Sequence, residues 1–512
     1  MNKYKKYRSY AKWFDSEELH RNLRDKSIKG GISTTGSQAI RFGLSLVSTY
    51  ILARILIPAD FGLIGMVVAF TGFASIIQDM GLSMAVIQKE RISHQQVTNL
   101  FWINVMICSA LALIFGLLSP FIVAFYHNDH RLYPIIWSYA IGIAISGLSI
   151  QHSALMTRRM LFTTLAKCNI GATLLSVVCG VASALWGWGY WAIVILNISS
   201  IFFNTILLWI ICDWRPSLPK RRQSITEFVH FGAAISGFNI VNYFSKNSDN
   251  IIIGKYVGPT AVGFYTKAYG LLMLPITHLK TPLTTVALPA MSKLQNDPIQ
   301  YINYYKKYVF VVAFFSMPLI AILGIFAKEI IYVILGSQWL PSSAIFQVLA
   351  IASFIEPVSS SSGLVMVSSG KTKKYFLTGC VSSVLFIAGF FISAKWGVMG
   401  ITASFAITTY ILLLPTLIYS FRNTPIKLSM FFGEILLPML HSFALVVVLL
   451  LTNRIFSLFV SSIPAAIFSS ILGISFYYFS WKIYPQGRNK FDNIKILLDF
   501  ITKKLGLRNM TI

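Results

Sequence analysis

The chain alternates long apolar stretches with short polar connections. A helix needs about 20 mainly apolar residues to span the hydrocarbon core of a bilayer. Stretches that satisfy this length are found at 31–54, 61–87, 98–125, 132–156, 162–186, 190–212, 226–252, 262–290, 308–334, 343–369, 375–394, 398–421, 431–452 and 460–481. No connection between them is long enough for a soluble domain. The pattern predicts an all-α integral membrane protein with about fourteen transmembrane helices.

Composition supports this class and excludes others. Of 512 residues, 55% are hydrophobic and 12% are charged, whereas an ordinary soluble domain has about 25% charged residues. This excludes a soluble enzyme and a disordered chain. The five cysteines form no paired motif, which excludes a secreted disulfide scaffold. A net charge of +26 would suggest nucleic acid in a soluble protein, but membrane proteins also carry surplus cations on their cytoplasmic loops. We therefore expect no nucleic-acid partner.

The basic residues are distributed asymmetrically between the two sides of the membrane. If the chain starts in the cytoplasm and each span reverses direction, 32 Lys and Arg residues lie on the cytoplasmic side and 6 on the other. The positive-inside rule then predicts that both termini are cytoplasmic. The basic N-terminal tail either lies on anionic lipid headgroups or is solvated.

The two halves of the chain resemble each other when one is shifted by 201 residues. GISTTGSQAIRFGLSLVSTYILARILIPADFG, at 31–62, then aligns without a gap on GAAISGFNIVNYFSKNSDNIIIGKYVGPTAVG, at 232–263. The matched pairs are Gly31 with Gly232, Gly36 with Gly237, Arg54 with Lys255, Pro58 with Pro259, and Gly62 with Gly263. The repeat unit holds six spans, an even number, so the two copies have parallel topology about an axis along the membrane normal.

The repeat predicts the domain organisation. We expect a cytoplasmic basic tail, an N-terminal lobe of six spans, a C-terminal lobe of six spans, two extra helices and a second cytoplasmic basic tail. Their predicted ranges are 1–30, 31–222, 223–427, 428–484 and 485–512. Two lobes related in this way suggest a transporter that alternates between inward-open and outward-open states, with its site at the lobe interface.

Polar residues inside the spans are the candidate site, because an ionisable residue there costs at least about 2.5 kcal/mol on insertion scales. In the first span Thr34, Gln38, Arg41, Ser45 and Ser48 form one stripe at helical spacing. The repeat places Asn239, Asn242, Lys246 and Asp249 at matching positions of the seventh span. The two faces are predicted to line a shared cavity, although Lys246 and Asp249 can also simply pair with each other.

Cations exceed anions within the spans. The cations are Arg41, Lys167, Lys246, Lys267 and Lys280, and the anions are Asp79, Asp249 and Glu356. This excess favours an anionic substrate, which we expect Gln38, Arg41, Asn239, Asn242, Lys246, Lys267 and Lys280 to bind. Lys167 and Lys267 can instead extend to an interface. The three acids are candidates for proton or cation coupling, and a structural ion-pair role is the alternative.

Enzyme motifs are absent from the sequence. There is no HExxH, no Walker-type glycine loop with lysine and no paired-cysteine metal site. We therefore expect a protein that is not an enzyme and that uses no cofactor or metal. Transport would be driven by an ion gradient, by membrane potential or by consumption of the substrate on the far side.

Several segments resemble one family. LARILIPADFGLIGMVVAF at 52–70, QDMGLSMAVIQ at 78–88, NLFWINV at 99–105 and HSALMTRRMLFTTLA at 152–166 are similar to polysaccharide-transport (Wzx-type) flippases. These belong to the multidrug/oligosaccharidyl-lipid/polysaccharide exporter superfamily, and the nearest subgroup is that of the colanic-acid and teichuronic-acid exporters. The order of predicted spans resembles that of family members along essentially the whole chain, with two six-helix lobes and the two extra helices that some members have.

The resemblance implies a function and partners. It implies translocation of undecaprenyl-diphosphate-linked oligosaccharide repeat units across the bacterial inner membrane, for O-antigen, capsule or exopolysaccharide assembly. The implied partners are the lipid-linked oligosaccharide, membrane lipids, and the polymerase and glycosyltransferases of the pathway. Related lipid flippases use basic residues in the first, second and eighth helices, where this chain has Arg41, Asp79 and Lys280. The second helix thus departs from the pattern.

Two alternatives remain. A cation-coupled drug antiporter of the same superfamily would share the architecture. A membrane polymerase or glycosyltransferase would be expected to carry a large external loop, which this sequence lacks.

Overall fold

The computed structural model describes residue 13 and residues 23–79, 81–89, 92–219, 243–244 and 247–483. Throughout these residues the regular elements are helices, which confirms the predicted all-α membrane fold. The predicted tail 485–512 lies outside the described residues. In the tail predicted at 1–30, Trp13 is buried, and the guanidinium carbon of Arg159 lies 5.1 Å from the centre of its ring.

Most of the predicted spans are present as helices. Eleven stretches of the described chain are long and apolar enough to cross a membrane, and one of them, Thr372–Phe421, contains two helices. They account for twelve of the fourteen predicted spans. The first predicted span lies within α3 (Leu23–Ile55), which is less apolar and is not among the eleven. The seventh, 226–252, lies mostly outside the described residues.

The chain forms two compact units. The first consists of Met1–Thr266 with Ile334–Gln338, and the second of Lys267–Val333 with Trp339–Ile512. Helix α13 (Pro259–Lys293) therefore begins in the first unit and continues into the second. The lobe boundary at 222 and 223 stays a prediction.

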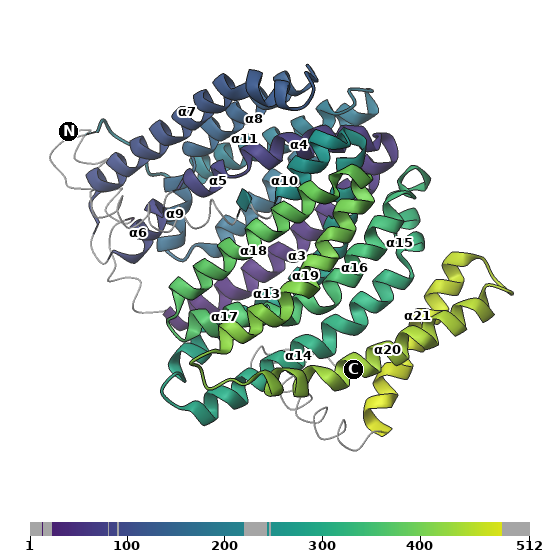
Figure 1. Cartoon of the computed structure of the whole chain (residues 1–512). Helices are drawn as coiled ribbons and strands as arrows, with labels where there is room; N and C mark the ends of the chain where they lie inside the picture. The colour runs from purple at the N-terminus through teal and green to yellow at the C-terminus, as the bar shows by residue number, and fades with distance from the viewer. Residues whose placement is uncertain are drawn as a thin grey trace, which may run out of the picture. The chain divides into compact units, whose positions relative to one another are not determined.

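The first unit is built from neighbouring long helices and several short ones. Helix α10 packs against α3 and α11, while α8 packs against α7 and α11 (Figure 1). The bounds are α4 (Pro58–Thr71), α5 (Ala74–Ile77), α6 (Leu82–Gln88), α7 (His94–Phe125), α8 (Leu132–Gly147), α9 (Ile150–Arg158), α10 (Phe162–Leu185) and α11 (Trp191–Ile211). Residues 247–256 are also helical.

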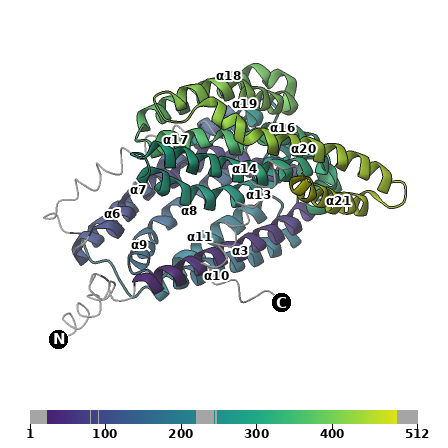
Figure 2. The same cartoon turned by 90° about the horizontal axis from the view of Figure 1, so that it is seen from below.

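In the second unit α14 contacts both α16 and α20, and α20 pairs with α21 in a hairpin that both general views show (Figures 1 and 2). Helices α18 and α19 pair with each other, and α19 packs on α16. The bounds are α14 (Pro298–Ile325), α15 (Ala327–Ile334), η1 (Ser337–Trp339), α16 (Ser342–Ser359), α17 (Ser361–Ser368), α18 (Thr372–Ser393), η2 (Ala394–Trp396), α19 (Gly397–Phe421), α20 (Leu428–Phe456) and α21 (Ser462–Ile483).

Four predicted spans are broken into shorter helices. The span predicted at 61–87 forms α4, α5 and α6, and the span at 132–156 forms α8 and α9. The span at 308–334 contains the end of α14 and all of α15, and the span at 343–369 forms α16 and α17. The mean hydropathy of a whole span does not reveal these breaks, although polar residues lie at some of them, including Gln78 and Asp79 before α6 and Ser360 between α16 and α17. Each break leaves backbone groups that need other partners, since lipid offers none.

Side chains satisfy the backbone at the break before α6. Oδ1 of Asp79 accepts hydrogen bonds from the Ser83 amide (2.9 Å) and the Ser83 hydroxyl (2.6 Å). Nδ2 of the buried Asn104 donates to the Gln78 carbonyl (2.8 Å), and Nε2 of Gln151 donates to Oδ1 of Asn104 (2.7 Å). The break is therefore a bonded element of the fold and Asp79 is part of its cap.

The first unit brings the two sequence repeats into direct contact. Helices α4 and α13 begin at Pro58 and Pro259, which are repeat mates. A Cβ placed on Gly62 would lie 1.6 Å from the Pro259 carbonyl oxygen, and one on Gly263 would lie 2.0 Å from the Pro58 carbonyl oxygen. The contact is reciprocal, so each repeat presents the same surface to the other. Glycine is required because the two backbones touch.

Further hydrogen bonds join the two repeats next to this crossing. Nζ of Lys255, which follows the seventh span, donates to the Phe125 carbonyl at the end of α7 (2.6 Å). Nε2 of Gln338, which follows α15, donates to the carbonyls of Ala53 (2.6 Å) and Leu56 (3.0 Å) at the end of α3. In both places a side chain of one repeat donates to carbonyls at a helix end of the other repeat, where helical carbonyls lack intrahelical partners.

We expect Gly62→Ala to destabilise the protein by about 1–3 kcal/mol, the cost of overpacking a close contact, because its methyl group would overlap the Pro259 carbonyl. Thermal unfolding of the detergent-purified chain measures the effect. Gly43→Ala is the matched control, since a Cβ at Gly43 meets nothing within 4 Å. Equal melting temperatures for both variants would contradict the contact.

Candidate functional site

The polar stripe predicted on the first span is mostly exposed on α3. Gln38 and Arg41 are exposed, and neither makes a hydrogen bond or ion pair within the described part of the chain. Ser48 is buried. Helix α3 packs against α10, and the Ser33 and Thr163 hydroxyls lie 2.8 Å apart in this contact. The side chain of Arg41 is therefore available to a ligand.

The seventh span is only partly described. Asn239, Asn242 and Lys246 lie outside the described residues. Asp249 is buried, and its Oδ2 accepts a hydrogen bond from the Tyr265 hydroxyl at 2.7 Å. Its Oδ1 accepts one from the Asn250 amide at 2.7 Å. A buried carboxylate needs such donors, and Tyr265 on α13 supplies one of them.

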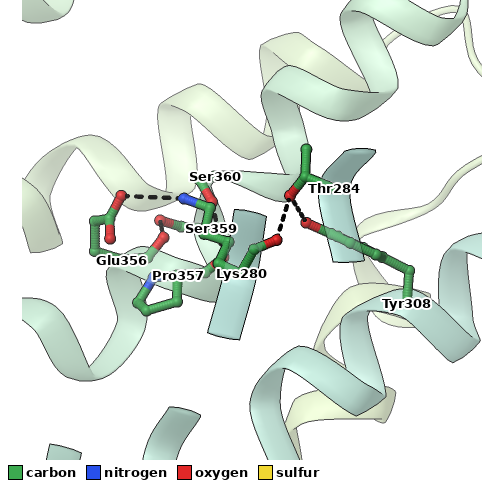
Figure 3. A network of polar contacts seen from close by, with 7 residues as sticks. All are labelled: Lys280, Thr284, Tyr308, Glu356, Pro357, Ser359 and Ser360. Atoms are coloured by element: carbon green, nitrogen blue, oxygen red, sulfur yellow. Dashed lines mark hydrogen bonds and ion pairs between the residues drawn. The ribbon is translucent and has the colours of Figure 1, made fainter. Parts of the chain in front are cut away.

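Lys280 on α13 and Glu356 on α16 form an ion pair in the second unit (Figure 3). Nζ of Lys280 lies 3.5 Å from Oε1 of Glu356, and the two side chains remain 26% and 38% exposed. Both residues lie in candidate spans. The structure therefore brings together a predicted substrate-binding cation and a predicted coupling acid, and leaves part of each accessible.

A proline interrupts the helical hydrogen bonding next to Glu356. Pro357 has no N–H, and α16 ends two residues later, at Ser359. The Ser359 hydroxyl donates to the Glu356 carbonyl (3.0 Å), and the Ser360 hydroxyl donates to the Pro357 carbonyl (2.7 Å), as Figure 3 shows. These serines satisfy carbonyls at the helix end, so Glu356 is held beside a stable break.

A side-chain hydrogen bond connects α13 to α14 beside the ion pair. The Thr284 hydroxyl donates to the Lys280 carbonyl at 3.0 Å and lies 2.9 Å from the Tyr308 hydroxyl (Figure 3). Lys280 precedes Pro282, one of three prolines inside α13. The contact from Tyr308 thus positions the turn that carries Lys280, where proline removes a backbone donor.

Tyr308 belongs to a set of tyrosines that sequence reasoning missed. Tyr301, Tyr305 and Tyr308 are spaced by four and three residues, so they share one face of α14, and all three are buried. Their hydroxyls lie near those of Ser368 (2.7 Å), Ser361 (3.2 Å) and Thr284 (2.9 Å), respectively. The helical spacing was a usable signal, whereas the partners on α17 and α13 were not predictable from spacing.

The remaining predicted residues lie elsewhere. Asp79 caps the helix break described above. Lys267 is half-buried on α13. Arg41 and Asp249 belong to the first unit, and Lys280 and Glu356 to the second. Within the described residues no group of three His, Cys, Asp or Glu side chains gathers as a metal site would require.

The apolar helices and the ionisable residues within them define an integral membrane transport protein. Residues 51–344 match the family described as "Polysaccharide biosynthesis protein". The match covers more than half of the chain, which therefore belongs to that family.

Relatives are similar along most of the chain. The lipopolysaccharide biosynthesis protein WzxC of Escherichia coli (strain K12) is 25% identical over 448 residues, covering 84% of this chain and 89% of that protein. The teichuronic acid biosynthesis protein TuaB of Bacillus subtilis (strain 168) is 25% identical over 444 residues, covering 82% and 88%.

Solved structures share the fold. The lipid II flippase MurJ in an inward closed conformation has a TM-score of 0.72 at 16% identity, covering 90% of this chain and 99% of that one. An inward-facing multidrug resistance MATE family transporter has a TM-score of 0.59 at 11% identity, covering 74% and 93%. These matches show that the chain shares the fold of both proteins.

We expect the Lys280–Glu356 pair to show a coupling energy of about 0.2–1 kcal/mol, the range for partly exposed ion pairs. A double-mutant cycle with Lys280→Gln, Glu356→Gln and both together, measured by thermal or denaturant unfolding, tests this. Lys395→Gln with Glu356→Gln is the control cycle, because Lys395 on η2 is exposed and is not paired with Glu356. Strict additivity in the Lys280 cycle would contradict a stabilising pair.

Proposed function

We propose that this protein is a flippase that moves undecaprenyl-diphosphate-linked oligosaccharide repeat units across the bacterial inner membrane by alternating access. The units would feed O-antigen, capsule or exopolysaccharide assembly. Membership of the polysaccharide biosynthesis family supports the pathway, and the names of WzxC and TuaB support the class of glycan. The fold shared with the lipid II flippase MurJ supports the proposal of transport and not catalysis.

The observation that carries the proposal is the partly exposed Lys280–Glu356 pair inside two spans. A lysine within a span is costly, and a single carboxylate 3.5 Å away compensates it weakly. The ammonium group can donate three hydrogen bonds, and phosphate oxygens accept charge-assisted bonds well. A diphosphate that enters the site would therefore replace Glu356 as the counter-ion of Lys280.

Arg41 supplies the second cation of the proposed diphosphate site. Its guanidinium presents N–H groups in a fork that matches phosphate geometry, and it is exposed without a partner in the described part of the chain. We propose that Arg41 and Lys280 bind the diphosphate, with Gln38 and Lys267 as further polar contacts. Asn239, Asn242 and Lys246 complete the predicted set.

We propose that acidic residues within the spans couple transport to a proton or a cation. When Lys280 binds the diphosphate, Glu356 loses its counter-ion and is free to take up a proton or a cation. Asp249 is the second candidate, since it is buried and held by Tyr265. Asp79 is a weaker candidate because its Oδ1 already accepts two hydrogen bonds at the break before α6.

A second candidate function is a cation-coupled drug antiporter. The buried Asp249 favours it, because a single buried acid suits exchange of a proton for a cationic compound. This function predicts that deletion of the gene sensitises cells to toxic cations and leaves surface glycan intact.

We expect Arg41→Ala and Lys280→Ala each to reduce glycan export at least about tenfold, the effect of losing about 1.4 kcal/mol of binding. The measurement compares surface polysaccharide, and lipid-linked units retained on the cytoplasmic face, in a deletion strain that expresses each variant. Lys395→Ala is the matched control, since this exposed lysine lies between spans on η2. Protein levels in the membrane must be equal.

Two outcomes would each overturn a different part of this proposal, the first the flippase function and the second the cationic site. One is a deletion strain that still displays surface glycan and accumulates no lipid-linked units. The other is normal export by both cation variants, which would reject the cationic site while the flippase function stands.

The proposed orientation places both termini in the cytoplasm, which charge placement supports. In a chain whose native cysteines are replaced by serine, we expect a membrane-impermeant maleimide to label Arg131→Cys and Lys395→Cys in intact spheroplasts. Lys427→Cys should be labelled only after permeabilisation. All three positions are exposed. The reverse labelling pattern would contradict the orientation.

A further inference from the structure

An apolar groove runs along the first unit between α8 and α11. Its volume is about 510 Å³, and its walls are formed by Ile145, Leu148, Phe202, Ile206 and Trp209. All five lie in candidate spans. The Nε1 group of Trp209 donates to the Leu148 carbonyl (2.8 Å) and so fixes the wall at the break between α8 and α9.

One charged residue, Arg215, lines this groove. It follows α11, which ends at Ile211. Its Nη1 donates to the carbonyls of Cys212 (2.5 Å) and Trp214 (2.8 Å), and its Nη2 donates to the carbonyl of Trp209 (2.6 Å). A guanidinium has five N–H groups, so Nε and one Nη2 hydrogen remain available within the described part of the chain.

Thr205 adds a second polar group to the groove. It is 7% exposed, it lines the groove, and its hydroxyl has no hydrogen-bond partner within the described residues. Thr205 precedes Trp209 by four residues, or about 6 Å along the helix axis. The guanidinium of Arg215 is bonded at the Trp209 carbonyl, so Thr205 and Arg215 line neighbouring parts of the groove.

We propose that this groove binds an anionic glycerophospholipid. Its phosphate contacts the free N–H groups of Arg215, and one acyl chain follows the apolar wall over Ile206. The Thr205 side chain rotates to bring its buried hydroxyl to an ester oxygen of the lipid. An Arg–phosphate contact is a strong charge-assisted bond, and a buried hydroxyl gains a partner it otherwise lacks.

The location of the groove favours this occupant. Its walls belong to membrane-spanning helices, so the surrounding molecules are lipids. Arg215 begins a basic segment that continues in the sequence with Lys220, Arg221 and Arg222, and basic residues next to a span attract anionic headgroups. The proposal is independent of the glycan that the protein carries.

Native mass spectrometry of the full-length chain in detergent tests the site. We expect dioleoyl phosphatidylglycerol to form a one-to-one complex at a concentration at least about fivefold lower than dioleoyl phosphatidylcholine. Arg215→Gln should abolish this preference. Thr205→Val should weaken phosphatidylglycerol binding about threefold. Arg131→Gln is the matched control, because Arg131 is an exposed loop arginine that pairs with Asp129, and it should leave binding unchanged.

Arg215 also binds three carbonyls, so its loss can disturb the fold. Ile206→Trp avoids this problem because it fills the groove without touching Arg215, and we expect it to reduce phosphatidylglycerol binding at least about fivefold. Equal retention of both lipids by the wild-type chain would overturn the proposal, as would unchanged binding in Ile206→Trp. Displacement of phosphatidylglycerol by undecaprenyl phosphate at lower concentration would instead assign the groove to the polyprenyl carrier.

Discussion

The requirement that every backbone polar group find a partner inside the membrane shapes this structure more than any single contact. Continuous helices meet it along most of the chain. Where helices break, side chains take over: Asp79 and Asn104 at the break before α6, and Ser359 and Ser360 after Pro357. The polar residues in these apolar spans therefore have two roles, since some satisfy backbone groups and others remain available for a ligand.

The same constraint explains how the repeats meet. Lipid tails provide little hydrophobic force between helices, so close packing and hydrogen bonds must hold them together. Gly62 and Gly263 bring the first turns of α4 and α13 into backbone contact. Lys255 and Gln338 then bond carbonyls at the ends of α7 and α3. Because the glycine contact is reciprocal, the symmetry of the repeat is itself part of the packing in the first unit.

The ionisable residues within the spans also fall into two groups, those bonded within the fold and those available to a ligand. Asp79 and Asp249 are engaged by hydrogen bonds from the protein, which makes each a stable part of the fold. Lys280 and Glu356 hold each other at 3.5 Å and stay partly exposed, and Arg41 is exposed and unpartnered in the described part of the chain. A site for an anion needs cations whose counter-ion can be exchanged, and Lys280 and Arg41 are the predicted residues that meet this condition.

Sequence alone determined the membrane class, twelve of the fourteen predicted spans and the register of the repeat. Each of these depends on patterns along the chain. Hydropathy reports the length of a helix, and the 201-residue shift aligns Pro58 with Pro259 directly. Tertiary structure decided the breaks inside four spans, the partner of Lys280 and the hydroxyl contacts of Tyr265 and Tyr308. These contacts depend on which helices pack together. A residue's spacing along its own helix carries no information about the residue on a neighbouring helix that forms its hydrogen bond or ion pair.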